Sequence, residues 1–473
     1  MMIHGLGFLS LSASVVLPWA LVGVVQGQKI TESLVTGIRQ SSVTNVRQSS
    51  FTDDRQLSTV QEKKLPKRTL ISAIGGTTFY VSGSGNDRNS GLSPSSAFRT
   101  PQRAANLTKP GDTVLLMNGV YKNSNSGAVL TITRSGSSNG WIAYKAYPGH
   151  SPKIEFDGWH GVWIKDGASY IEVKGIEIEG NNERISLGYA MSQRYNVSNA
   201  RTSGNCLTID GRSKRHPHHI RILNNEIRDC GGGGIIGIQT DYVTVDGNDV
   251  YNNAWYSPFG GSGISFLKNW SYDGNQGYRM FITRNRVYNN KMLVPWINTG
   301  KKQDGNGIIL DRLAETGYRG RTLIANNLVY RNGGGGIHAF KSNNIDIIHN
   351  TSYYNSQTPE IEYGQISMNN TSNVRVLNNI LVSQSGQQIY MNSRKNSNTV
   401  FNYNLYNTLL GASGKGPNDI VADPQFVNAG SNFRLRSSSP AINSGMRFDP
   451  VTSDFAGSSR AKGSKPDRGA YEI

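Results

Sequence analysis

Three basic side chains recur at one position of a repeated sequence pattern. Lys268, Arg312 and Lys341 each stand four residues after an apolar residue that successive repeats share. If the repeats stack as neighbouring strands, these cations lie about 5 Å apart from one repeat to the next. Like charges at that spacing repel each other unless an anion lies among them. The spacing therefore predicts a site that binds an anion, whereas the alternative is that the side chains spread into solvent.

Carboxylate and imidazole side chains flank the same strands. Asp304 and Asn306 precede the strand that Asp311 ends, and His338 belongs to the next repeat. A histidine beside a carboxylate can serve as a base or an acid. The alternative is that Asp and Asn stabilise turns and that His338 is a surface residue. We interpret Asp304 as a weak candidate metal ligand, Lys341 and Asn306 as candidate substrate-binding residues, and as candidate catalytic residues Lys268, His338, Asp311 and Arg312.

These residue types suit the cleavage of a polysaccharide that contains uronic acids. In a β-elimination, a base removes the proton next to the carboxylate, and the oxygen on the following carbon departs. The carboxylate must be neutralised by Arg, Lys or Ca²⁺, and a neutral Lys or His can be the base. We favour such a lyase. Hydrolysis by Asp304 and Asp311 is the second hypothesis, and a C5-epimerase and a non-catalytic carbohydrate-binding protein are further alternatives.

Long segments interrupt three repeats at the same corner, just before the shared apolar residue. They cover residues 252–260, 290–303 and 358–363. Segments that interrupt equivalent corners of a repeat protein line one face of it, so we expect them to wall a groove. Unless they only seal their own loops, four aromatic residues in or beside these segments are expected to stack on sugar rings: Trp255, Tyr256, Trp296 and Tyr363.

The elements that must position these residues are short strands. The pattern recurs with a period of about 22–30 residues, which is typical of a solenoid. The shared residue and the residue two positions on are apolar in almost every repeat, so both should face inward and the residue between them outward. Asn and Gly at the corners suit tight turns. The pattern predicts an all-β solenoid whose shared positions are Leu207, Ile235, Ile264, Ile308, Ile337, Ile366 and Ile389.

The opening of the repeat region resembles a known family. Its segments YVSGSGND (80–87), FRT (98–100), PGDTV (110–114) and NGVY (118–121) are similar to the start of right-handed parallel β-helix proteins near polysaccharide lyase family 9. The resemblance implies a right-handed parallel β-helix and a polysaccharide lyase. That family uses an aspartate-built Ca²⁺ site and a Lys base. This chain lacks the Asp-Asp-Gly-x-Asp run and has His338 where the Lys is expected, so Ca²⁺ is a candidate cofactor without a clear site.

The ends of the chain differ from the repeats. Residues 1–27 look like a secretory signal peptide, although their apolar stretch is also near the length of a membrane anchor. Residues 28–75 are rich in Ser, Thr, Gln and Arg and predict a disordered linker or pro-segment. The β-helix is expected over residues 76–422, with a short helix at 101–107 that caps its N-terminal end. Residues 423–473 are expected to form a C-terminal cap packed on the last repeat.

Charge and cysteine content indicate the surroundings in which the protein works. The formal net charge is +17, which favours an anionic partner, and export favours acidic polysaccharide over nucleic acid. We expect a secreted monomer without a membrane anchor after signal cleavage. Cys206 and Cys230 could form one disulfide or remain buried thiols, and the basic run at residues 212–219 is expected to be a solvated loop. Glycosylation triplets, which agree with export, start at Asn106, Asn196, Asn269, Asn350, Asn369 and Asn370.

Overall fold

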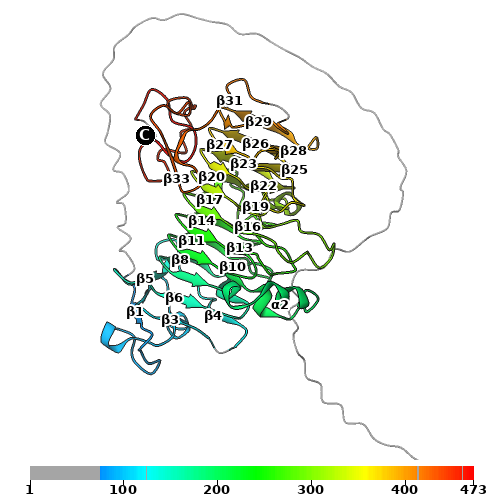
Figure 1. Ribbon diagram of the computed structural model, residues 1–473. Coiled ribbons are helices and arrows are strands. Elements are labelled where there is room, and N and C mark those ends of the chain that lie inside the picture. The colour runs from blue at the N-terminus through cyan, green and yellow to red at the C-terminus, as the bar shows by residue number, and fades with distance from the viewer. Residues whose placement is uncertain (1–74, 124, 413–414, 461) are drawn as a thin grey trace, which may run out of the picture. The chain divides into compact units, whose positions relative to one another are not determined.

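The computed structural model describes residues 75–123, 125–412, 415–460 and 462–473. Within them, parallel strands one repeat apart pair into three long sheets, which we name A, B and C (Figure 1). Sheet A consists of β1 (Thr78–Val81), β2 (Thr113–Leu116), β5 (Ile142–Ala146), β8 (Ser169–Lys174), β11 (His218–Leu223), β14 (Asp241–Asp246), β17 (Tyr278–Thr283), β20 (Arg321–Ala325), β23 (Asn343–Ile348), β26 (Ser372–Leu377) and β29 (Ser397–Asn402).

Sheets B and C complete each turn of the chain. Sheet B consists of β3 (Val120–Tyr121), β6 (Lys153–Glu155), β9 (Glu177–Glu179), β12 (Glu226–Arg228), β15 (Asp249–Tyr251), β18 (Arg286–Tyr288), β21 (Leu328–Tyr330), β24 (Thr351–Tyr353), β27 (Ile380–Val382), β30 (Leu405–Tyr406) and β31 (Ile420–Val421). Sheet C consists of β4 (Ala128–Ile132), β7 (His160–Lys165), β10 (Asn205–Asp210), β13 (Ile235–Ile238), β16 (Ile264–Leu267), β19 (Ile308–Asp311), β22 (Ile337–Phe340), β25 (Ile366–Asn369) and β28 (Tyr390–Asn392). This arrangement confirms the predicted all-β parallel β-helix.

The interior follows the predicted alternation along the strands of sheet C. Ile308 and Leu310, two positions apart in β19, are fully buried, and their partners in β22 are Ile337 and Ala339. Apolar side chains from all three sheets form one continuous core. The prediction was wrong at the last repeat, because Tyr390 and not Ile389 pairs with Ile366. The aromatic ring of Tyr390 therefore occupies the inward position there.

Buried asparagines join successive repeats at two corners. In the longer ladder, the Oδ1 of each asparagine accepts hydrogen bonds from the backbone N–H and the Nδ2 of the previous one, as at Asn248, Asn285 and Asn327. Each buried amide thus satisfies corner groups that the sheet pairing leaves free. The longer ladder contains Asn225, Asn248, Asn285, Asn327, Asn350, Asn379 and Asn404, and the shorter one contains Asn253, Asn290, Asn332 and Asn355.

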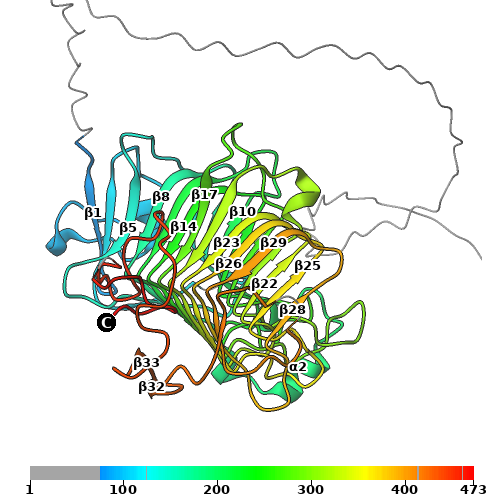
Figure 2. The ribbon, with the colours of Figure 1, turned by 90° about the horizontal axis from the view of Figure 1, so that it is seen from above.

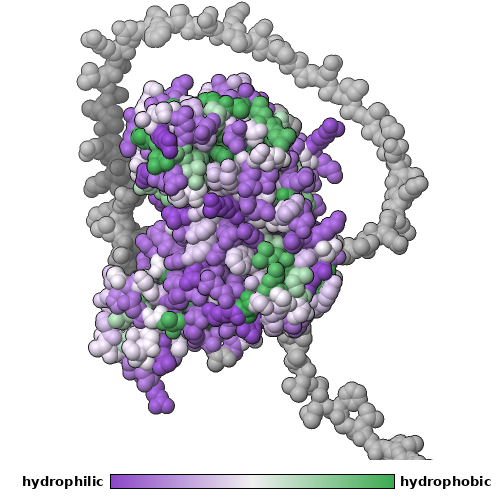
Figure 3. All heavy atoms as spheres, viewed as in Figure 1, coloured by the Kyte–Doolittle hydropathy of each residue, from purple (hydrophilic) through white to green (hydrophobic). Residues whose placement is uncertain are grey.

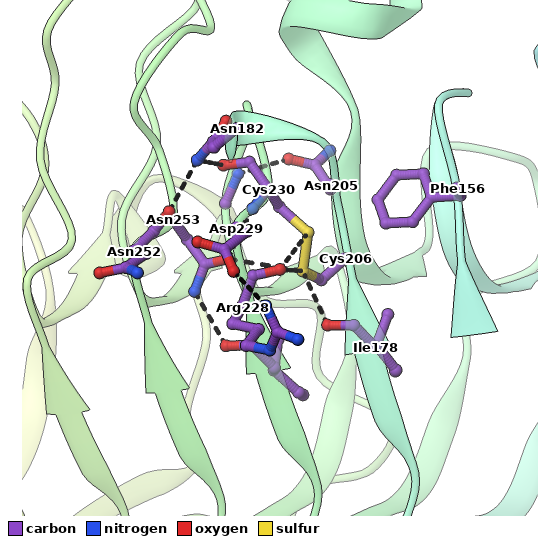
Figure 4. Close-up of a disulfide and its surroundings, with 12 residues drawn as sticks. Phe156, Ile178, Asn182, Asn205, Cys206, Arg228, Asp229, Cys230, Asn252 and Asn253 are labelled. Atoms are coloured by element: carbon purple, nitrogen blue, oxygen red, sulfur yellow. Dashed lines mark hydrogen bonds and ion pairs between the residues drawn. A yellow bond between two sulfur atoms is a disulfide. The ribbon is translucent and has the colours of Figure 1, made fainter. Parts of the chain in front are cut away.

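One disulfide links two consecutive repeats. Cys206 at the start of β10 bonds to Cys230 after β12, with a Cα–Cα distance of 5.7 Å (Figure 4). Both residues are fully buried. Beside them, the Oδ1 of Asn253 accepts a hydrogen bond from the backbone N–H of Cys230. The structure therefore decides between the two alternatives that the sequence left open.

Helices and the C-terminal tail lie outside the sheets. The predicted N-terminal helix is confirmed as α1 (Pro101–Ala105), which buries Ala104 and Ala105 against the first repeats. The other helices of the described residues are α2 (Leu187–Ser192), α3 (Ala200–Ser203), η1 (Pro94–Ser96), η2 (Asn182–Arg184) and η3 (Leu313–Thr316). The tail forms the antiparallel pair β32 (Phe426–Asn428) and β33 (Asn432–Leu435).

The sequence predicts a cap that packs on the last repeat. The tail packs on several earlier repeats as well. Phe433 and Ala470 pack with residues of β21, β24 and β27, several repeats back along the chain. The guanidinium of Arg460 donates to Asn326 at 2.6 Å. Apolar side chains of sheet B point outward along this flank, and the tail covers them.

Several predictions concern the surface or the N-terminus. The predicted signal peptide and most of the linker lie outside the described residues, and no helix among those described is long and apolar enough to cross a membrane. Asn269 and Asn350 are fully buried, so these two glycosylation triplets are inaccessible in the folded chain. The face drawn in Figure 3 is mainly hydrophilic, with a hydrophobic area near α2, where Leu187 and Met191 are exposed.

Candidate functional site

Loops that precede the strands of sheet C pack together along one edge of that sheet, near α2 (Figure 2). The three predicted segments are all there, and residues 180–204, which the sequence analysis missed, form a fourth. Arg194 of this fourth segment donates to the carbonyls of Pro295 and Trp296, at 3.0 and 2.8 Å. Tyr256 donates to the carbonyl of Ile185. The loops therefore support one another instead of extending separately into solvent.

These loops cover more of sheet C than expected. The residues predicted to face outward, such as Ile309, His338 and Ser367, are 7%, 6% and 0% exposed. The edge where the strands end is accessible. There Asp311 is partly exposed, and the corner residues that follow the strands reach solvent.

The predicted column of cations forms this edge. Lys268, Arg312 and Lys341 directly follow β16, β19 and β22, and all three have left-handed backbone angles, with φ of 50°, 60° and 46°. Backbone hydrogen bonds continue the sheet through the column. The N–H of Lys268 donates to the backbone carbonyl of Asp311, and the N–H of Arg312 donates to that of Phe340. The stacking predicted from the repeat is therefore present.

A carboxylate of the same chain lies among the three cations. Glu315 of η3 lies 2.8 Å from Arg312 Nε, 3.1 Å from Lys341 Nζ and 3.6 Å from Lys268 Nζ. Hydrogen bonds and charge from Arg312 and Lys341 hold the pKa of Glu315 below its ordinary value although burial acts in the opposite direction. Glu315 was not among the residues predicted from the sequence, although it is the single acid in the insertion that follows Arg312.

Two aspartates that flank β19, Asp304 before it and Asp311 at its end, have raised pKa values. Burial, reinforced by the charge of Asp311, raises the pKa of Asp304 to about 7. Burial raises the pKa of Asp311 to about 6 although Arg312 and the two lysines oppose the shift. Asp311 Oδ1 has no hydrogen-bond partner among the described residues. Such shifts are common in carboxyl groups that transfer protons, and they also occur in structural sites.

His338 is a buried imidazole without polar partners. Neither ring nitrogen has a hydrogen-bond partner within the described part of the chain, and burial lowers the pKa of His338 to about 4. The ring of Tyr363 lies against it, with ring centroids 4.6 Å apart, and burial together with the charge of Asp304 raises the pKa of Tyr363. His338, Tyr363 and Asp304 thus form one neighbourhood, in which the imidazole is neutral at ordinary pH.

The other predicted binding residues divide into two groups. Asn306 is fully buried, with its Oδ1 accepting from Gly335 at 2.9 Å, so it braces the loop instead of facing substrate. Trp255 and Tyr256 pack into an apolar cluster with Val294, and Trp255 Nε1 donates to the carbonyl of Asn289. These contacts agree with the alternative interpretation, in which they seal their loops. Trp255, Trp296 and Tyr363 are partly exposed.

The residues of this edge do not fit a calcium site of the expected kind. Ca²⁺ takes six to eight oxygen ligands. No group of three or more His, Cys, Asp or Glu side chains in the described ranges lies close enough to share a metal ion. The polar neighbour of Asp304 is the amide nitrogen of Asn306, 3.5 Å from Asp304 Oδ1, which is a donor and not a metal ligand.

The three stacked sheets of parallel strands define the chain as a parallel β-helix protein. The family described as "Pel9A-like, right handed beta helix region" matches residues 79–373. The chain therefore belongs to the Pel9A-like right-handed β-helix family, and both the right-handed fold and the resemblance noted from the sequence are confirmed. A search of curated proteins found no match.

Several solved structures are similar to this chain. Pectate lyase Pel9A has a TM-score of 0.50 at 17% identity, with 84% of this chain and 96% of that chain covered. A rhamnogalacturonan lyase has a TM-score of 0.45 at 15% identity, covering 75% and 91% of the two chains. The GH136 lacto-N-biosidase from Eubacterium ramulus has a TM-score of 0.45 at 15% identity, covering 70% and 56%. At these identities the likeness concerns the fold alone.

Proposed function

We propose that this protein cleaves an acidic polysaccharide by β-elimination at the edge of sheet C. The observation that supports the proposal is the position of Glu315, whose carboxylate is held by Lys268, Arg312 and Lys341. A uronate needs the same neutralisation before its neighbouring proton can be removed. The substrate carboxylate would take the place of Glu315 among the three cations.

His338 is the proposed base. It is neutral above a pKa of about 4, whereas Lys268 and Lys341 are ion-paired with Glu315. The imidazole takes the proton on the carbon that bears the carboxylate, and the electron pair forms the new double bond. The ring of Tyr363 must move aside or pack against the sugar for this contact, because it lies over His338.

Asp304 is the proposed acid. With a pKa of about 7, it remains protonated in mildly acidic solution and can give its proton to the departing glycosidic oxygen. The bond between that oxygen and the sugar ring breaks as the double bond forms. The products are one chain with a free hydroxyl and one that ends in an unsaturated uronate, and no water is consumed.

Hydrolysis is the second candidate, and it has its own support. Asp304 and Asp311 have raised pKa values of about 7 and 6, and a protonated and an ionised carboxyl group are the usual pair in glycoside hydrolysis. In that reaction Asp311 would activate water while Asp304 protonates the leaving oxygen. The cation column would then only bind substrate.

We also propose that the protein is secreted and acts as a monomer. The buried disulfide between Cys206 and Cys230 supports an oxidising compartment.

The test is an assay of the purified protein on a panel of polyuronates, with and without a chelator. Ultraviolet absorbance of an unsaturated uronate supports elimination, and new reducing ends without that absorbance support hydrolysis. His338→Ala and Asp304→Asn should each lower kcat by about 100-fold or more. Lys174→Ala, an exposed substitution on the outer face of sheet A, is the matched control. Wild-type activity in both site variants would place the chemistry elsewhere.

A further inference from the structure

A second group of aromatic and basic side chains lies at the N-terminal end of sheet C. Lys165 ends β7, and it stands in the same column as Asp311 through the pairings with Asp210, Ile238 and Leu267. Four strand spacings, about 19 Å in all, therefore separate Lys165 from Asp311 along the edge. Trp163, two residues before Lys165, is partly exposed.

Asp210 holds this group in a fixed arrangement. It is 6% exposed, and it accepts hydrogen bonds from Trp163 Nε1 at 3.2 Å and from Arg212 Nη2 at 2.7 Å. These contacts and burial act in opposite directions, and the pKa of Asp210 is lowered overall, so it is an anion. The imidazole of His160 stacks on the indole of Trp163, and the ammonium of Lys165 lies 4.0 Å from the centroid of that indole. A carboxylate thus orients one indole and one guanidinium at the protein surface.

The loop after β10 adds positive charge to the same place. Arg212, Lys214 and Arg215 are exposed, and a Cβ added at Gly167 would lie 2.7 Å from Arg215 Cβ, so the loop packs against the turn that follows Lys165. This loop contains the basic run that the sequence analysis treated as solvated.

Between this group and the Glu315 site, the edge carries no charge. The column positions there are Ile238 and Leu267, and the corner residue is Gln239. The two groups are therefore separate along this stretch of the edge.

We propose that Trp163, Lys165 and Arg212 form a distal subsite for a uronic acid residue of the same polysaccharide chain. The inference rests on the proposed function for the identity of the polymer. Lys165 and Arg212 pair with the sugar carboxylate, beside the indole that Asp210 orients. A polysaccharide chain that reaches both places spans the four strand spacings, about 19 Å, between Lys165 and Asp311. The protein thus binds a polysaccharide chain that is long enough to reach both places.

Oligouronides of defined length test the subsite. For wild-type protein, kcat/KM should rise steeply once the oligomer is long enough to reach from Asp311 to Lys165, at about four to six residues. In the double variant Lys165→Ala/Arg212→Ala, and in Trp163→Ala, the ratio of kcat/KM on polymer to that on a trimer should fall about tenfold. Lys174→Ala is the matched control, and the melting temperature of each variant establishes that it is folded.

Binding of the intact polymer, measured by affinity electrophoresis, separates this inference from the proposed function. If no polyuronate is cleaved but polymer binding weakens about tenfold in both subsite variants, the subsite stands and the proposed reaction fails. If the wild-type protein cleaves polyuronates and the variants keep its dependence on chain length, the subsite is overturned and the reaction stands. A wild-type protein that neither binds nor cleaves polyuronates overturns both.

Discussion

Glu315 lies among three cations at equivalent corners of successive repeats, and its carboxylate contacts each of them. Stacked like charges predict an anion at this place, and the folded chain supplies one of its own. The three basic side chains are 31% to 38% exposed and Glu315 is 28% exposed. An incoming carboxylate can therefore compete with it from solvent.

Glu315→Gln should strengthen the binding of a polyuronate. The substitution keeps the shape of the side chain and removes the competing charge, so we expect an affinity gain of about tenfold at low salt. Isothermal titration calorimetry with a defined oligouronide measures it. Glu362→Gln, an exposed acid beside Tyr363, is the control. Unchanged affinity in Glu315→Gln would mean that substrate does not enter the cation column.

The pH dependence of kcat/KM should distinguish the two candidate reactions. If Asp304 is the acid, activity falls as pH rises through about 7, because its carboxyl loses the proton it must donate. If His338 is the base, activity also falls below about pH 4, where the imidazole becomes protonated. Hydrolysis by ionised Asp311 would instead place the acidic fall near pH 6.

The Asp304→Asn variant is the control for the alkaline fall. Residual activity in this variant should lack the fall near pH 7, since no proton is lost there. A fall that persists unchanged would assign it to another group.

At the scale of elements, the buried asparagine ladders fix the stacking that brings the site residues together. Asn285 Oδ1 accepts from the backbone N–H and the Nδ2 of Asn248, and its own Nδ2 donates to Asn327 and to the carbonyl of Val245. Each ladder member is therefore bonded on both sides. Removing one leaves donors of the previous repeat without partners in a dry corner.

Asn285→Ala should lower the free energy of unfolding by about 2–4 kcal/mol, because two buried donors of Asn248 lose their acceptor. Urea denaturation followed by circular dichroism measures the change. Asn298→Ala, at an exposed loop position, should alter stability by no more than about 0.5 kcal/mol. Equal effects of the two substitutions would contradict the structural role of the ladder.

The disulfide acts on the unfolded chain. It joins cysteines 24 residues apart, and closing a loop of that length removes about 3 kcal/mol of conformational freedom from the unfolded state. The double variant Cys206→Ala/Cys230→Ala should therefore lose stability of that order, measured by urea denaturation under oxidising conditions. The same denaturation of the wild-type protein with a reductant is the control, and identical curves for the variant and the oxidised wild type would contradict the prediction.

At the scale of the whole molecule, sequence periodicity predicts the β-helix because one residue type recurs at each position of the repeat. Lys268, Arg312 and Lys341 could be aligned for that reason, and the structure stacks them as expected. The same periodicity assigned Ile389 to the shared position that Tyr390 occupies, since Ile389 is also apolar.

The parts of the site that the sequence did not reveal come from insertions, which follow no period. Glu315 lies in one such insertion, and residues 180–204 form another. Loop–loop contacts such as Tyr256 with Ile185 join segments far apart in the chain, so the burial of the outward column of sheet C could not be read from spacing. The tail illustrates the same limit, because its contact with Asn326 crosses 134 residues.

The most direct test of the central claim is to cleave a polyuronate in water labelled with heavy oxygen and to weigh the products by mass spectrometry. Elimination breaks the chain without consuming water, so we predict unlabelled fragments, one member of each pair carrying an unsaturated end. Incorporation of one labelled oxygen at each cleaved bond would contradict elimination and support hydrolysis by Asp304 and Asp311.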